Sequence, residues 1–124
     1  MRRAAIAIAL VTGSVVAGAC GGDSGSGSDT DAKTIAITLS DKGCEPRSIS
    51  TPAGKTKFTV TNEGTSAVTE FEVKDGDKIL GEVENVIPGA EREFQLTLKE
   101  GMYVTECPGG SDFDEGTLEV TAAA

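Results

Sequence analysis

Apolar and polar side chains alternate in short runs along the chain from Lys33 onward. In the first run, Ile35, Ile37 and Leu39 are separated by single small or polar residues, and this two-residue period predicts a half-buried β-strand. Similar runs occur at Phe58 and Val60, at Phe71 and Val73, at Phe94, Leu96 and Leu98, and at Leu118 and Val120. Turn signals rich in Gly, Pro and Asn separate the runs, and no stretch has a helical period. We therefore predict an all-β sandwich of seven or eight short strands.

The run around Phe71 carries acidic residues as well as apolar ones. Its alternation places Glu70 and Glu72 on one face of the strand, and Phe71 and Val73 on the other. The dipeptide Asp75-Gly76 follows, which is a strong signal for a two-residue hairpin turn. The next segment is therefore expected to return antiparallel to this strand.

These acids have two interpretations. Alternating acids usually form the solvated face of a strand. However, like charges on one face repel each other, and a second acidic pair, Glu82 and Glu84, follows within the same hairpin region. A bound cation would relieve that repulsion. Carboxylate oxygens suit hard cations such as ferric iron, calcium or magnesium.

The first 32 residues predict export and anchoring. Residues 1–19 combine Arg2 and Arg3 with an apolar stretch and a small-residue cleavage site, which is the pattern of a signal peptide. Cys20 follows directly and resembles the cysteine of a bacterial lipobox, so we expect it to carry a lipid; the alternative is an ordinary secretory signal. The lipidated Cys20 opens a Gly/Ser/Asp-rich linker, residues 20–32, with too little apolar surface to fold. One domain is expected over residues 33–124, at the extracytoplasmic face of the cell membrane.

Composition excludes several classes of function. The formal net charge of −9 argues against nucleic acid as a partner and favours cations. Because the chain has no histidine, it cannot form a blue-copper site, which needs two of them. It also lacks a histidine base, a nucleophile elbow and a cofactor fingerprint. We do not expect an enzyme.

Cys44 and Cys107, the two remaining cysteines, also have two interpretations. In an exported protein, a disulfide is the default expectation for such a pair. It would stabilise a small secreted domain by closing a long loop. As thiolates, the same residues would be soft ligands suited to copper. The sequence leaves both possibilities open.

An ordered set of short motifs runs through the predicted domain. They are residues 41–46 (DKGCEP), 53–56 (AGKT) with Phe58, 70–72 (EFE) and 82–89 (EVENVIPG), followed by Gly101, Tyr103 and Cys107. In this order they resemble the cupredoxin-like domain of the EfeO family, the extracytoplasmic component of the EfeUOB iron-uptake system. The resemblance implies a cupredoxin-like Greek-key β-sandwich. Many members continue into a long helical imelysin-like domain, and a chain ending at Ala124 is expected to be a stand-alone lipoprotein without it.

The resemblance also implies metal sites built from cysteines and acids. By position, Cys44, Glu70 and Cys107 would form a softer site for copper. Glu70 and Glu72, with acids around them, would form a harder site for ferric iron. Two further acids of the family are matched by Glu82 and Glu84.

Two functional hypotheses follow. In the first, the protein is a lipid-anchored extracytoplasmic module that binds iron, copper or both, beside the iron-permease and peroxidase components of the uptake system. In the second, it is an Ig-like interaction domain of the cell envelope, stapled by one disulfide and binding no metal. Neither hypothesis involves nucleic acid.

Overall fold

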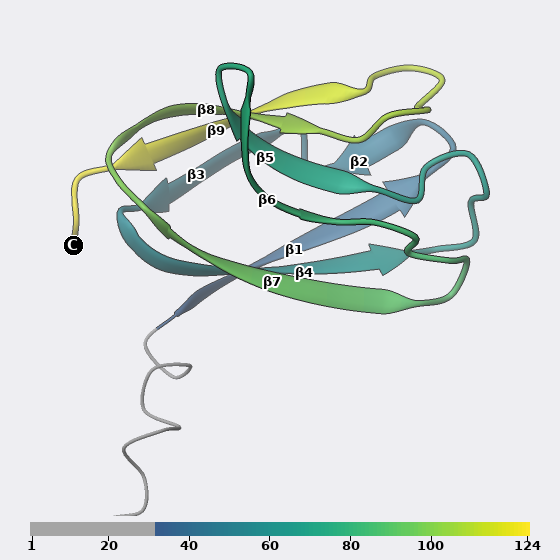
Figure 1. Cartoon of the computed structure of the whole chain (residues 1–124), viewed down its shortest axis with the longest axis horizontal. Helices are drawn as coiled ribbons and strands as arrows, with labels where there is room; N and C mark the ends of the chain where they lie inside the picture. The colour runs from purple at the N-terminus through teal and green to yellow at the C-terminus, as the bar shows by residue number, and fades with distance from the viewer. Residues whose placement is uncertain (1–31) are drawn as a thin grey trace, which may run out of the picture.

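Two β-sheets face each other in the computed structural model, which describes residues 32–124 (Figure 1). The predicted signal peptide, Cys20 and the linker up to residue 31 lie outside the described residues. The strands are β1 (Lys33–Ser40), β2 (Gly43–Glu45), β3 (Ser48–Pro52), β4 (Gly54–Asn62), β5 (Phe71–Asp75), β6 (Lys78–Val83), β7 (Glu91–Leu98), β8 (Gly101–Glu106) and β9 (Glu115–Thr121). Within residues 32–124, no helix has the length and apolar character needed to cross a membrane.

The sheets combine parallel and antiparallel strand pairs. One sheet has the order β2-β1-β4-β7 and the other the order β3-β9-β8-β5-β6. β1 runs parallel to β4, and β3 runs parallel to β9. The predicted all-β sandwich is confirmed, with nine strands over the described residues instead of seven or eight. The short strands β2 and β3, of 3 and 5 residues, are too brief to show a clear period.

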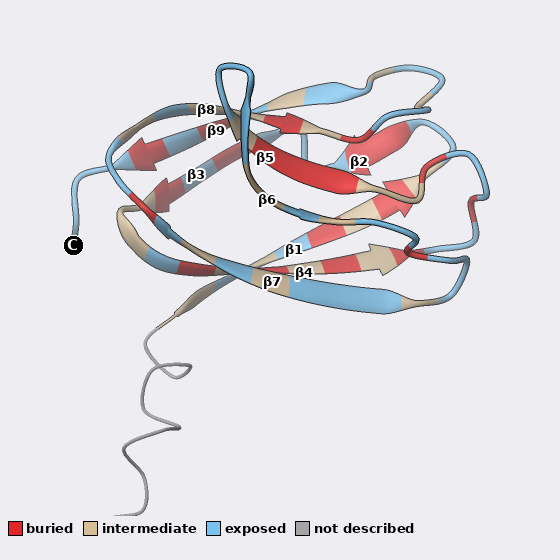
Figure 2. Ribbon diagram, in the orientation of Figure 1, coloured by how far each residue is buried: buried red, intermediate tan, exposed pale blue. Residues whose placement is uncertain are grey.

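Three phenylalanine rings pack together at the interface of the two sheets. Phe58 on β4 and Phe94 on β7 stack with ring centroids 5.1 Å apart. Phe71 on β5 reaches them from the other sheet, at 5.8 Å and 6.1 Å. Figure 2 shows buried residues on strands of both sheets, where this core lies. Because Phe71 and Val73 are both buried in the core, Glu72 projects from the opposite face of β5, here called the outer face of the five-stranded sheet.

The predicted hairpin of β5 and β6 forms, with its turn one residue later than the dipeptide Asp75-Gly76 indicated. Asp75 pairs with Lys78, so Gly76 and Asp77 are the two turn residues. Gly76 has a φ of 59°, which a glycine adopts without steric cost. Going away from the turn, the register of the two strands shifts between Lys74 and Val73. Beyond this shift the hairpin places Glu82 directly opposite Glu72.

Candidate metal centre

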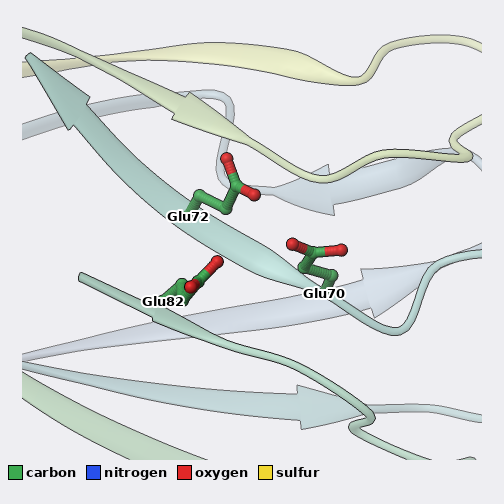
Figure 3. A group of neighbouring side chains, drawn as sticks. All are labelled: Glu70, Glu72 and Glu82. Carbon is green, nitrogen blue, oxygen red and sulfur yellow. The ribbon is translucent and has the colours of Figure 1, made fainter. Parts of the chain in front are cut away.

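Three carboxylates converge on the outer face of the β5–β6 hairpin. Glu70 immediately precedes β5, Glu72 lies within it, and Glu82 lies on β6. One oxygen from each of the three carboxylates lies within 4.8 Å of the others. Figure 3 shows the three side chains directed toward one another across the two strands. We call Glu70, Glu72 and Glu82 the carboxylate cluster.

Glu72 is the buried member of this cluster, with 8% of its surface exposed. The strand alternation correctly placed it beside Glu70, but its position is not the solvated face that alternating acids usually form. Burial, followed by a hydrogen bond and charge repulsion from Glu70, raises the pKa of the Glu72 carboxyl to about 7. Near neutral pH, Glu72 therefore holds its proton for part of the time, and a cation binding there would displace it.

The remaining predicted ligands lie outside this cluster. Cys44 and Cys107 are joined by a disulfide with an S–S distance of 2.06 Å and a Cα–Cα distance of 6.0 Å. Both residues are buried, and sulfurs in a disulfide carry no thiolate. Glu84 is exposed just beyond the end of β6. The carboxylate cluster is the one group within residues 32–124 whose ligand atoms are close enough to share a metal ion.

Two residues that the sequence did not single out lie beside the cluster. Glu106 on β8 pairs directly with Glu72 in the strand register. Its carboxylate accepts a 2.6 Å hydrogen bond from the ammonium of Lys74 on β5. The alternation of β8 could have placed Glu106 on the outer face. Only the register between β5 and β8 brings it next to Glu72.

A buried asparagine holds the segments that flank the cluster. The Asn62 Nδ2 donates hydrogen bonds to the carbonyls of Thr65 at 2.8 Å and Val86 at 2.7 Å. The backbone N–H of Val86 also donates to the carbonyl of Thr69 at 2.9 Å. Thr69 directly precedes Glu70, so these bonds fix the start of β5 against the segment that follows β6.

The chemistry of this arrangement suits a hard cation. Its three candidate ligands are all carboxylates, which favour oxygen-seeking metals such as ferric iron, calcium and magnesium. A cation would neutralise a cluster whose like charges otherwise repel one another. Copper at a cysteine site does not fit this disulfide form, because both sulfurs are already bonded to each other.

Comparisons with known proteins identify a family and several relatives. The family model described as cupredoxin-like domain matches residues 4–120. The iron uptake system component EfeO of Yersinia pestis is 37% identical over 94 residues, which are 76% of this chain and 24% of that protein. The chain thus spans between a fifth and a quarter of the length of the curated relatives it matches.

Solved structures support the same architecture. Auracyanin from Roseiflexus castenholzii superimposes with a TM-score of 0.59 at 18% identity, covering 73% of this chain and 98% of the other. Auracyanin A from Chloroflexus aurantiacus, a "blue" copper protein, gives a TM-score of 0.58 at 16% identity, covering 71% and 98%. At these identities the likeness concerns the fold. The matched family model and the identity to EfeO show that the chain belongs to the cupredoxin-like domain family, in the form found in EfeO.

Proposed function

We propose that this protein is an extracytoplasmic metal-binding module of an iron-uptake system, with ferric iron as its cargo. The observation that carries the proposal is the convergence of Glu70, Glu72 and Glu82 within 4.8 Å, with Glu72 buried. Its relatives are named as iron uptake components. The module acts by binding and release, not as an enzyme.

The cluster offers three hard oxygen ligands from two adjacent strands. Glu72 lies on β5 and Glu70 immediately precedes it, next to Thr69, whose carbonyl accepts the Val86 backbone hydrogen bond; Glu82 comes from the paired strand β6. Such a site binds a small, highly charged ion better than a soft one. The three-carboxylate cluster, without histidine or thiolate, therefore favours ferric iron over copper.

A ferric-ion titration tests the proposal. The ion is supplied as a competing chelate, and Glu70→Gln is compared with Glu84→Gln, which removes the same charge from an exposed position outside the cluster. We expect Glu70→Gln to weaken binding at least tenfold, equivalent to about 1.4 kcal/mol of binding free energy. The Glu84→Gln variant should bind like the wild type. Equal affinities in the two variants would show that the carboxylate cluster is not the metal site.

The proposal includes a membrane anchor at Cys20, outside the described residues. Three small residues precede Cys20 in the sequence, as in a lipoprotein signal. Full acylation of this cysteine would hold the module at the membrane, where the iron-permease and peroxidase components of the system are its proposed partners. A Cys20→Ser protein should then leave the membrane fraction. Undiminished membrane association of that variant would contradict the anchor.

The disulfide favours a second candidate function. Because Cys44 and Cys107 are bonded to each other, the domain can be a stapled interaction module of the envelope that binds no metal. Thiol counting followed by metal titration separates the two. Failure of the oxidised and the reduced protein to bind either ferric iron or copper would favour this second function.

A further inference from the structure

Four acids form one row across the outer face of the five-stranded sheet. The strand registers place Glu82 opposite Glu72, Glu72 opposite Glu106, and Glu106 opposite Glu115. The row therefore crosses β6, β5, β8 and β9 without interruption. Like charges directly opposite each other destabilise a sheet, so a cation beside this row would stabilise it.

Lys74 supplies a cation in the metal-free protein. It lies two residues beyond Glu72 on β5, and its ammonium contacts the Glu106 carboxylate at 2.6 Å. Both side chains are about three-quarters buried, with exposures of 22% and 25%. Lys74 also interacts electrostatically with Glu72. Because this ammonium belongs to a residue of β5, it stays beside the carboxylate cluster.

We propose that Lys74 and Glu106 form a gate on the metal site. In the empty site, Lys74 is the resident counter-ion and occupies Glu106. An incoming hard cation displaces the ammonium, and Glu106 then joins its cross-strand neighbour Glu72 as a ligand. This inference rests on the proposed function, because it assumes that the carboxylate cluster binds the metal.

The gate would set how tightly the metal is held. The metal must break the Lys74–Glu106 contact before Glu106 can become a ligand. The free energy needed to release the ammonium makes the net binding of the metal weaker. After the metal leaves, the ammonium returns to Glu106, because Lys74 lies on β5, the strand that pairs with the β8 strand of Glu106. Lys74 thereby weakens the site and favours release, which suits a module that passes its cargo onward.

Terbium(III), a hard trivalent ion that can be followed by its luminescence, is the probe for the gate. In the full chain, Lys74→Met should raise Tb³⁺ affinity at least tenfold, or about 1.4 kcal/mol. The control is Lys57→Met, since Lys57 also pairs with a glutamate across two strands, in the other sheet, although its contact with Glu93 is longer at 3.5 Å and Glu93 is more exposed. That control changes the net charge equally but should alter affinity by less than about threefold.

A second comparison tests whether Glu106 becomes a ligand. In the Lys74→Met background, Glu106→Gln should weaken Tb³⁺ binding at least tenfold. Glu119→Gln, which removes the same charge from an exposed position on β9, should change it by less than about threefold. Equal effects of these two substitutions would show that Glu106 acts only through its charge and would overturn the proposal.

The outcomes separate the gate from the site itself. If Glu72→Gln abolishes Tb³⁺ binding while Lys74→Met and Lys57→Met behave alike, the carboxylate site stands and the gate is wrong. If Glu72→Gln binds Tb³⁺ as well as the wild type, both the proposed site and the gate fail. A gain of affinity in Lys74→Met cannot come from damage to the fold.

Discussion

At the scale of single residues, Glu72 combines burial with a neighbouring like charge. Both effects favour its neutral form and raise its pKa to about 7, from the ordinary 4.5. The folded protein therefore binds a proton at Glu72 in a pH range where the unfolded chain has already lost it. The contribution of Glu72 to the free energy of unfolding therefore falls as the pH rises from about 4.5 to about 7.

A Glu72→Gln variant should be more stable than the wild type in alkaline solution. The amide imitates the protonated acid, so the variant avoids charging a buried group. In metal-free buffer at about pH 8, we expect its free energy of unfolding to exceed that of the wild type by about 2–3 kcal/mol. The difference should vanish toward about pH 4. Urea denaturation at both values of pH measures it.

An exposed acid supplies the control for this prediction. Glu84→Gln removes an equal charge outside the carboxylate cluster, and we expect it to change the stability by less than about 0.5 kcal/mol at either pH. Equal stability of Glu72→Gln and the wild type at about pH 8 would mean that the Glu72 carboxyl ionises without penalty in the fold.

The sequence predicted the face of the strand on which Glu72 lies, but not its burial or its neighbours on β8. Alternation along one strand is local, so it correctly paired Glu70 with Glu72 on one face. Burial depends on what lies across the sheet, and the Lys74–Glu106 contact joins residues 32 positions apart. No local pattern reports such a register, which is why Glu106 and Lys74 were not predicted.

At the scale of elements, the β5–β6 hairpin was the most predictable part of the site. Its turn chemistry and its alternation agree, and both are local signals. The bulge at Val73/Lys74 and the close approach of β6 to β7 were not predictable, because they depend on packing between strands. Gly81 on β6 lies where the two strands come close together. A Cβ added there would lie 2.9 Å from side-chain atoms of Phe94 and Leu96.

A Gly81→Ala substitution should therefore push β6 away from β7. Phe94 cannot move aside freely, because its ring stacks on Phe58 at 5.1 Å. We expect a loss of about 1–3 kcal/mol of stability from overpacking. Since Glu82 is the next residue, Tb³⁺ affinity should also fall. Thermal unfolding and luminescence titration test both effects, and a variant with unchanged stability and affinity would refute this account of Gly81.

At the scale of the whole molecule, one disulfide joins the two sheets. Cys44 lies on β2 of the four-stranded sheet, and Cys107 directly follows β8 of the five-stranded sheet. The predicted export signal made a disulfide the default expectation for the two cysteines. The sequence did not show which strands the bond would connect, because strand β2 was not predicted. The cysteines are 63 residues apart in the sequence, so the bond closes a long loop of the unfolded chain.

Removing this bond should lower the stability of the domain but leave metal binding by the carboxylate cluster unchanged. For a loop of this length, we expect the lost loop constraint in Cys44→Ser/Cys107→Ser to lower the free energy of unfolding by about 4 kcal/mol, and the two buried serine hydroxyls to lower it further. Urea denaturation measures the loss, and the wild type with reductant should show a similar one. Glu70, Glu72 and Glu82 are positioned by β5, β6 and the bonds of Asn62, so the folded double variant should keep Tb³⁺ affinity within about threefold of the wild type. Loss of Tb³⁺ binding in a folded double variant would mean that the disulfide is also needed to position the carboxylate cluster.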